Sequence, residues 1–342
     1  MPNLRNTYIV CTREDKGRKF LNEPGAASFL RVPATRDGYA PSDAISPERW
    51  KRSVIAAADG VEDEITGSTG EILFFVHGYA NDIEIVLWRT RMLQQTLTAA
   101  GWRGLVVGFD WPSANSTLNY LEDRQDASNV STQLVDQALA LLVDAQAPTA
   151  AGAQPCTMNV HMLGHSTGAY VIMEAFANAA KRGDYFKKPW RIGQVAFIAG
   201  DVSTGSLAGD SDWARPMFDR IFRLTNYSNG FDKVLAVSNM KRFGTSPRAG
   251  RVGIPAEAPR KVVNVDCSDY FATKNPDHSV FKGTFNHSWH IGDEAFALDL
   301  ALTLEGSIDR NHLPTRAVKN GSLSLVAGAT RPEFQANWDR VG

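Results

Sequence analysis

Short apolar runs alternate with longer amphipathic stretches along most of the chain. Several runs are rich in Val, Ile and Phe without alternation, which is typical of strands buried on both faces. The pattern predicts strands at residues 7–12, 28–32, 71–77, 105–110, 157–164, 194–199, 221–227 and 261–266. It predicts helices at residues 47–59, 82–100, 118–145, 167–181, 213–220, 231–241 and 289–304. We therefore expect an α/β fold with a mostly parallel central sheet of about eight strands, flanked by helices on both faces.

The same pattern suggests a division of the chain into three parts. Residues 1–70 form an N-terminal extension that carries the first strands, and residues 71–304 form the core. Residues 305–342 are polar, and we expect a loop-like C-terminal tail with little core potential. Because few residues separate the strands predicted at 194–199 and 221–227, we expect no large lid domain.

Composition narrows the classes of function. The chain has 36 Lys and Arg against 37 Asp and Glu, so a basic surface for nucleic acid is not expected. No signal-peptide pattern opens the sequence, and no apolar stretch approaches the about 18 residues of a membrane span. The three cysteines, Cys11, Cys156 and Cys267, are far apart and fit reduced thiols. We expect a cytoplasmic protein without stable membrane insertion, and its oligomeric state stays open.

The most informative segment is Gly164-His165-Ser166-Thr167-Gly168, a G-x-S-x-G pentapeptide. A predicted strand precedes it and a predicted helix follows it. A sharp turn from strand to helix needs glycines where a Cβ would clash, and it exposes the middle residue. This context is typical of the nucleophile elbow of α/β-hydrolases, with Ser166 as the nucleophile.

A serine hydroxyl needs a base, and the base needs an orienting acid. In this fold the chain order is Ser, then Asp or Glu, then His. Asp232 follows the second strand beyond the elbow and is the leading candidate for the acid, with Asp201, one strand earlier, as the alternative. His287 lies in the predicted loop before the last helix and is the leading base, with His290, in the first turn of that helix, as the alternative.

The tetrahedral intermediate of acyl transfer needs two N–H donors. We expect one from the backbone of Thr167, directly after the serine and at a helix N-terminus. We expect the other from the His77-Gly78-Tyr79 turn, at the amide of Tyr79. The remaining histidines of these segments, including His77 and His165, are expected to be structural hydrogen-bonding groups.

Several motifs occur together in a set order. They are Phe75-Val76-His77-Gly78-Tyr79, Phe109-Asp110-Trp111-Pro112-Ser113, the serine pentapeptide, the segment from Tyr227 to Leu235, Pro247-Arg248-Ala249-Gly250-Arg251, and Asn286-His287-Ser288-Trp289-His290. The set resembles the bacterial α/β-hydrolases grouped as a domain of unknown function, which are relatives of serine esterases and lipases. The resemblance covers about residues 7–303 and implies that Ser166, Asp232 and His287 are nucleophile, acid and base.

The sequence therefore predicts a serine hydrolase that cleaves carboxylic esters through an acyl-enzyme. The substrate is expected to be a small ester with an apolar acyl or aryl part. The alternatives are a thioesterase or acyltransferase with the same triad, and a non-catalytic binding protein on the same scaffold. No cofactor is needed for this chemistry, and no motif with metal-ligand spacing supports a zinc mechanism.

Overall fold

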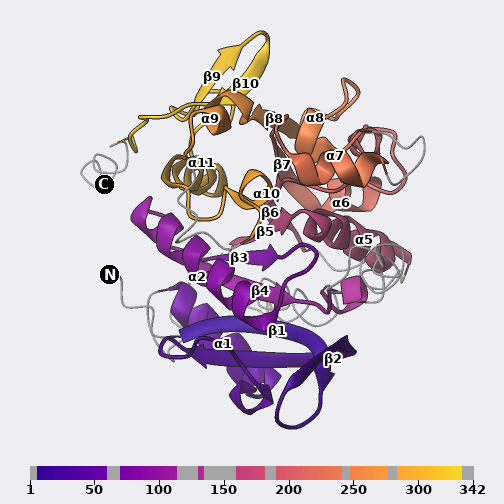
Figure 1. Cartoon of the computed structure of the whole chain (residues 1–342), viewed down its shortest axis with the longest axis vertical. Coiled ribbons are helices and arrows are strands. Elements are labelled where there is room, and N and C mark those ends of the chain that lie inside the picture. Colours follow the sequence, from indigo (N-terminus) through magenta and orange to yellow (C-terminus); the bar gives the residue numbers. More distant parts are fainter. Residues whose placement is uncertain are drawn as a thin grey trace, which may run out of the picture.

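The computed structural model describes residues 6–59, 70–113, 130–134, 159–181, 190–240, 247–275 and 283–332. These residues form one ten-stranded sheet in the order β2-β1-β4-β3-β5-β6-β7-β8-β10-β9 (Figure 1). The strands are β1 Asn6–Asp15, β2 Phe20–Pro33, β3 Glu71–Val76, β4 Leu105–Asp110, β5 Asn159–His165, β6 Ile192–Ile198, β7 Ile221–Ser228, β8 Val262–Asp266, β9 Arg316–Lys319 and β10 Ser322–Leu325. All eight predicted strands are present, and the sheet has two more.

The sheet is parallel except at its two edges. β2 pairs with β1 and β9 pairs with β10 in antiparallel fashion, whereas every other neighbouring pair is parallel. Parallel strands bring their carboxyl ends to one edge of the sheet. The segments that follow β3, β5 and β7 therefore meet there, and these segments carry the candidate residues.

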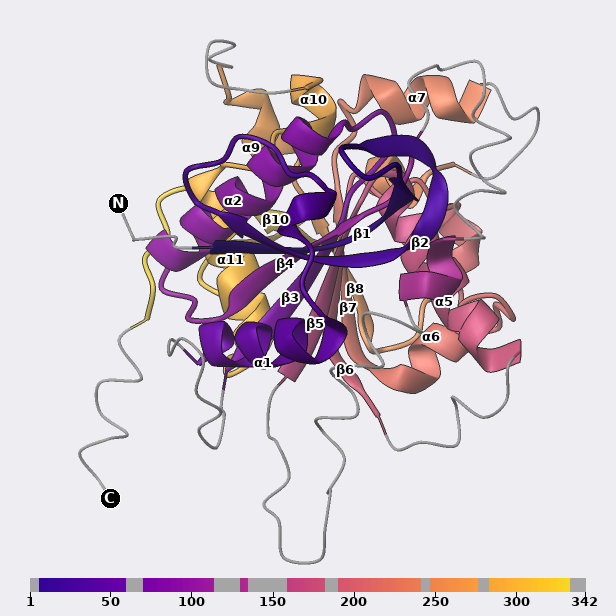
Figure 2. The same ribbon diagram turned by 90° about the horizontal axis from the view of Figure 1, so that it is seen from below.

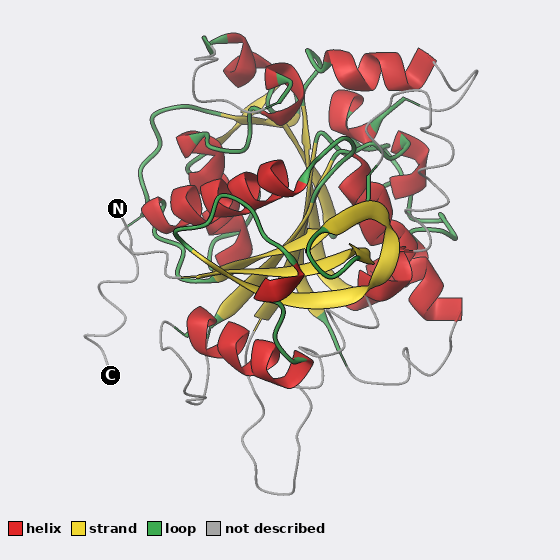
Figure 3. Cartoon of the chain, turned by 60° about the horizontal axis from the view of Figure 1, so that its bottom comes forward, coloured by secondary structure: helices red, strands yellow, loops and turns green. Residues whose placement is uncertain are grey.

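Helices cover both faces of the sheet (Figure 3). The described helices are α1 Pro47–Ala58, α2 Ile83–Ala99, α5 Thr167–Lys181, α6 Arg215–Arg220, α7 Lys233–Met240, α8 Ala249–Val252, α9 Ser268–Ala272, α10 Phe285–Ser288 and α11 Glu294–Glu305, with 3-10 turns η1 Pro41–Asp43 and η3 Thr204–Leu207. Only residues 130–134 of the helix predicted at 118–145 are described, and the rest lies outside the described residues. None of the described helices has the length and apolar character needed to cross a bilayer.

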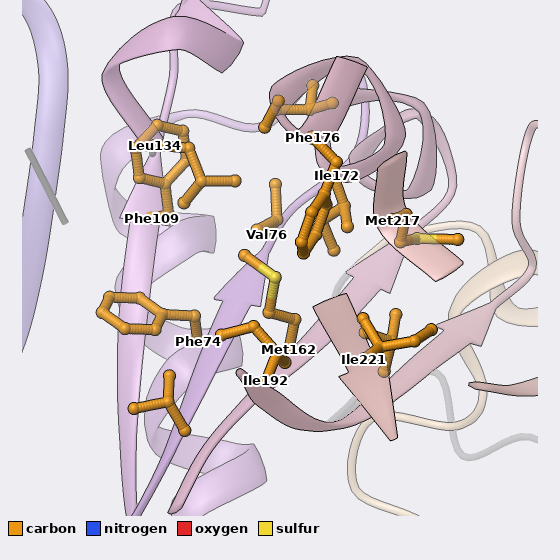
Figure 4. Packing of buried hydrophobic residues seen from close by; sticks show 14 of the residues in the cluster. Phe74, Val76, Phe109, Leu134, Met162, Ile172, Phe176, Ile192, Met217 and Ile221 are labelled. Carbon is orange, nitrogen blue, oxygen red and sulfur yellow. The ribbon is translucent and has the colours of Figure 1, made fainter. Parts of the chain in front are cut away.

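Two apolar clusters share the strands between them. Phe74 and Val76 of β3 face α1, α5 and α6, whereas Leu73 and Phe75 of the same strand face α2 and α11. Figure 4 shows the first cluster, in which Met162 of β5 and Ile172 of α5 lie beside Phe74 and Val76. Consecutive apolar residues therefore serve opposite faces, as expected for a strand buried on both sides. This two-sided burial fixes the strand ends that carry the site.

The single helix predicted at 289–304 is wrong at its start. The structure has the short α10, then a turn, and then α11 from Glu294. Gly292 in the turn has φ 103°, and the side chain of Asp293 accepts a hydrogen bond from the amide of Phe296 as the N-cap of α11. His287 therefore lies in α10 and His290 lies in the turn, instead of in a loop and a first helical turn.

The prediction of a loop-like tail is also wrong. β9 and β10 form a hairpin whose second strand pairs with β8 and extends the sheet, seen in yellow in Figure 1. The turn between them is Asn320-Gly321, with φ 51° and φ 78°. Both residues tolerate positive φ, which the tight hairpin turn needs. The strands have four residues each, too short and too polar to show a clear periodicity.

Candidate active site

Ser166 lies at the sharp turn between β5 and α5. Its φ is 55°, a left-handed conformation that is costly for a residue with a Cβ. Three backbone hydrogen bonds hold the turn: the Ser166 amide donates to Ile198 at 3.0 Å, and the Ser166 carbonyl accepts from Ala169 at 3.1 Å and from Asp201 at 3.0 Å. Strain held in place by such contacts is typical of functional turns.

Gly168 explains why α5 can begin at this position. A Cβ on Gly168 would lie 2.1 Å from the carbonyl oxygen of Val76 at the end of β3. Any side chain would push α5 away from the sheet, so the last glycine of the pentapeptide is required for the close packing. The N-terminus of α5, with the Thr167 amide, therefore lies at the carboxyl edge of the sheet.

The turn after β3 lies directly against the serine. A Cβ on Gly78 would stand 2.6 Å from the Cβ of Ser166 and 2.9 Å from the carbonyl oxygen of His165. The amide of Tyr79, the next residue, belongs to the same turn. The two segments that carry the expected N–H donors, at Thr167 and Tyr79, thus flank Ser166.

A buried polar network holds this turn in place. Asn81 donates from Nδ2 to the carbonyls of Gly78 at 2.7 Å and Tyr79 at 2.9 Å. The carbonyl of Asn81 accepts from Arg13 at 2.8 Å, and Arg13 also pairs with Asp110 at 2.7 Å. Burial disfavours the charged carboxylate, but Arg13 and hydrogen bonds outweigh burial and hold the pKa of Asp110 well below its usual range. Asp110 therefore stays ionised and holds Arg13, which in turn bonds to the carbonyl of Asn81 in this turn.

Asp232 and His287 are in direct contact. The Oδ2 atom of Asp232 lies 2.7 Å from Nδ1 of His287, and both side chains are buried. The other carboxylate oxygen accepts a hydrogen bond at 2.9 Å from the amide of Leu235 in the first turn of α7. α7 and α10 lie along the same edge of the molecule in Figure 2. The contact therefore joins two segments that are distant in sequence.

Asn229 ties the same two segments together and was missed from the sequence. Its Nδ2 donates to the carbonyl of Asn286 at 3.3 Å, and its Oδ1 accepts from the amide of Phe231 at 3.1 Å. Asn229 thus shapes the turn before Asp232 and contacts the residue before His287. The sequence signal is an asparagine followed by glycine after a strand, which predicts a turn without indicating its partner.

The two alternative residues have other partners. The carboxylate of Asp201 forms a buried ion pair with Arg248, with Oδ1 3.0 Å from Nε. The His290 ring stacks on Trp289 with centroids 4.1 Å apart and meets Phe296 edge-on at 5.2 Å. Within the described part of the chain, neither ring nitrogen of His290 has a hydrogen-bond partner. Burial holds the pKa of His290 well below its usual range, so it is a neutral packing residue.

His165 and Arg89 complete the surroundings of His287. The rings of His165 and His287 have centroids 5.0 Å apart, and His165 precedes Ser166 in the chain. Arg89 projects from α2 and reaches both His165 and Ser288. The sequence signal for Arg89 is a charged residue between Val86 and Leu93 on the buried stripe of the helix.

The cysteine and metal expectations concern other parts of the chain. Cys11 and Cys267 are buried free thiols, and Cys156 lies outside the described residues. Across the described ranges, no group of three or more His, Cys, Asp or Glu side chains could hold a metal ion.

The comparisons with known proteins give a family. An esterase from the archaeon Pyrobaculum calidifontis shares 14% identity, with 89% of this chain and 86% of that chain covered and a TM-score of 0.39. The carboxylesterase EstE1 from a metagenomic library shares 14% identity, with 69% and 78% covered and a TM-score of 0.34. No curated protein matches the sequence. The model of the family "Alpha/beta hydrolase of unknown function (DUF900)" matches residues 55–272, and the chain belongs to this family.

Proposed function

We propose that the protein is a serine hydrolase that cleaves carboxylic esters through an acyl-enzyme intermediate. Ser166 is the nucleophile, His287 is the general base and Asp232 orients the imidazole. The observation that carries the proposal is the 2.7 Å contact between Asp232 and Nδ1 of His287. It leaves Nε2 of the same ring as the nitrogen that can accept a proton. The position of Ser166 also supports the proposal. Ser166 has a strained backbone conformation, and the ring of the preceding residue, His165, packs on the ring of His287.

The reaction follows from these roles. Oγ of Ser166 attacks the ester carbonyl carbon while Nε2 of His287 takes the hydroxyl proton. The imidazolium is stabilised by the carboxylate of Asp232. Collapse of the tetrahedral intermediate breaks the C–O bond, and His287 gives its proton to the leaving alkoxide. A water molecule then attacks the acyl-enzyme with His287 again as base, which releases the acid and restores Ser166.

The amides of Thr167 and Tyr79 are the proposed donors to the oxyanion. Thr167 is the first residue of α5, where the helix dipole favours a negative charge. The position of Gly78 against Ser166 brings the Tyr79 turn to the same side. Each such donor typically contributes about 3 kcal/mol to the transition state.

The proposed substrate is a small ester with an apolar acyl or aryl part. Phe231, directly before Asp232, has 53% of its side chain exposed, and its ring lies 6.1 Å from that of Phe271. This apolar surface lies beside the candidate acid. Phe285 extends this apolar surface, with its ring 5.6 Å from that of Phe271. Trp289, in contrast, is buried and packs against Phe296 of α11.

An acyl-chain series tests this substrate class. We expect kcat/KM for p-nitrophenyl esters to rise from acetate to hexanoate, since each buried CH₂ contributes about 0.8 kcal/mol. Phe231→Ala should flatten the series, and Val318→Ala, a change at an exposed position of β9, should leave its slope unchanged. Equal rates across chain lengths would contradict the apolar site. Faster cleavage of matched thioesters would favour a thioesterase.

Labelling with a fluorophosphonate tests the proposed function itself. We expect intact mass spectrometry to show one adduct on the wild-type protein and none on Ser166→Ala, because only an activated serine reacts quickly. Ser322→Ala removes an exposed hydroxyl on β10 and should keep the adduct. Absence of an adduct on folded wild-type protein would favour a binding protein on the same scaffold.

A further inference from the structure

Arg89 is a buried cation in α2. It has 5% of its surface exposed, and among the described residues no carboxylate forms an ion pair with its guanidinium. Burial lowers the pKa of Arg89 to about 10, so the group keeps its charge at neutral pH. Burying a charge is costly unless ion pairs or hydrogen bonds compensate it, so the hydrogen bonds of Arg89 bear on the cost of its burial.

The two terminal guanidinium nitrogens of Arg89 bond to groups beside the candidate base. Nη1 lies 3.4 Å from Nδ1 of His165, and Nη2 donates to Oγ of Ser288 at 3.2 Å. Gly283 closes over the group, because a Cβ there would lie 2.7 Å from Nη2. Arg89 is therefore packed in one position against the segment that contains His287.

These contacts select one tautomer of His165. Arginine only donates hydrogen bonds, so Nδ1 of His165 must be the unprotonated, accepting nitrogen. Nε2 lies 3.1 Å from the backbone carbonyl oxygen of His287, which only accepts, so Nε2 must carry the proton. It also lies 3.3 Å from Oγ of Ser288. The partners on both sides of the ring thus require the same neutral form.

We propose that Arg89 and His165 are positioning residues for His287: the guanidinium fixes His165 as the Nε2–H tautomer, and this N–H holds the main chain of α10. The contact with Asp232 sets the tilt of the His287 ring, whereas the contact with His165 sets where its backbone lies. His165 directly precedes Ser166 in the chain. Its hydrogen bond to the carbonyl of His287 therefore links the backbone beside the proposed nucleophile to the backbone of the proposed base. This inference rests on the proposed function only in its kinetic consequence.

The tautomer can be measured on the wild-type protein without any assay. In protein labelled with ¹⁵N-histidine, two-bond ¹H–¹⁵N correlation spectra distinguish Nε2–H, Nδ1–H and doubly protonated rings. The signal absent from His165→Gln identifies the residue. We expect the Nε2–H form at neutral pH. An Nδ1–H or doubly protonated ring would overturn the proposal, whether or not the protein hydrolyses esters.

Kinetics test the positioning role. Glutamine places an amide N–H near the position of Nε2, whereas leucine removes the donor. We expect His165→Leu to lower kcat for p-nitrophenyl butyrate about 100-fold with KM nearly unchanged, because small displacements of a catalytic group have such effects. His165→Gln should retain kcat within about fivefold. Equal kcat values for the two variants would overturn the role of the N–H.

A buried histidine on the same strand provides the matched control. His161 is 2% exposed, and its Nδ1 accepts from the amide of Gln194 at 2.9 Å, away from α10. His161→Leu should lower the unfolding midpoint without a change in kcat per folded molecule. If it lowers kcat as much as His165→Leu, the effect is general destabilisation and the positioning role fails. Absence of a fluorophosphonate adduct on folded wild-type protein would instead reject the proposed function and leave the tautomer result intact.

Discussion

At the scale of single residues, Asp232 meets two demands with its two oxygens. Oδ1 caps α7 through the amide of Leu235, and Oδ2 contacts His287. The cap fixes the carboxylate, so the orientation of the imidazole depends on the fold of α7 and not on a free rotamer. Asp201, in the segment that follows the neighbouring strand β6, is also buried but pairs with Arg248. We therefore expect substitution of Asp232 to affect catalysis and substitution of Asp201 to affect stability.

Asparagine substitution separates the two aspartates. Asp232→Asn keeps an oxygen for the helix cap but removes the charge and the acceptor at His287, so we expect kcat to fall about 10⁴-fold with the fold retained. Asp201→Asn leaves the buried Arg248 without its partner, so we expect a loss of about 3–5 kcal/mol in the free energy of unfolding, with kcat per folded molecule unchanged. Steady-state kinetics and urea unfolding measure both. The reverse pattern would assign the acid to Asp201.

At the scale of elements, the sequence predicted what depends on local pattern. Continuous apolar runs identified β3, β4 and β5, and G-x-S-x-G located the turn between β5 and α5. Where one signal outweighed another, the prediction failed: Gly292 breaks an apolar stretch that reads as a single helix, and Asn320-Gly321 forms a hairpin from polar residues.

The residues of the candidate site likewise include some that the sequence predicted and some that it did not. Chain order led to Asp232 and His287, which the structure brings into contact. The contacts of Arg89 and Asn229 join segments far apart in the chain, and no local pattern encodes a partner at such a distance. The sequence signals were an arginine within an apolar stripe for Arg89 and an Asn-Gly pair after a strand for Asn229, and neither signal indicates the partner.

The turn between β3 and α2 gives the prediction at this scale. Gly78→Ala would place a Cβ 2.6 Å from the Cβ of Ser166, so one of the two turns must shift. We expect kcat to fall about 100-fold because the turn carries the proposed Tyr79 donor. The free energy of unfolding should fall by about 1–3 kcal/mol.

Gly38 provides the control for this change. A Cβ on Gly38 would find its nearest atoms at 4.0 Å, so Gly38→Ala should leave both quantities near wild type. Steady-state kinetics and urea unfolding give kcat and the free energy of unfolding for both variants. A fully active Gly78→Ala variant would show that the turn does not contribute to the transition state.

At the scale of the whole molecule, a buried polar network joins the C-terminal hairpin to α11 and β7. Arg316 at the start of β9 pairs with Asp299 of α11 at 2.6 Å, and Asp299 also accepts from the hydroxyl of Tyr227 at 2.6 Å. Tyr227 lies near the end of β7, the strand that leads to Asp232. Burial disfavours the carboxylate, but Arg316 outweighs it and lowers the pKa of Asp299. The network thus connects β9, α11 and β7, the strand that leads to the candidate acid.

The energetics of this pair can be measured against the exposed ion pair that Lys319, another residue of the hairpin, forms with Asp269 of α9. Arg316→Met leaves Asp299 buried and uncompensated, so we expect a loss of about 3–5 kcal/mol in the free energy of unfolding. Adding Asp299→Leu should recover much of this loss, because the isolated charge is then gone. Lys319→Ala breaks only the exposed pair with Asp269 and should cost less than about 1 kcal/mol. If Arg316→Met unfolds at the wild-type urea concentration, the buried pair does not contribute to the free energy of unfolding.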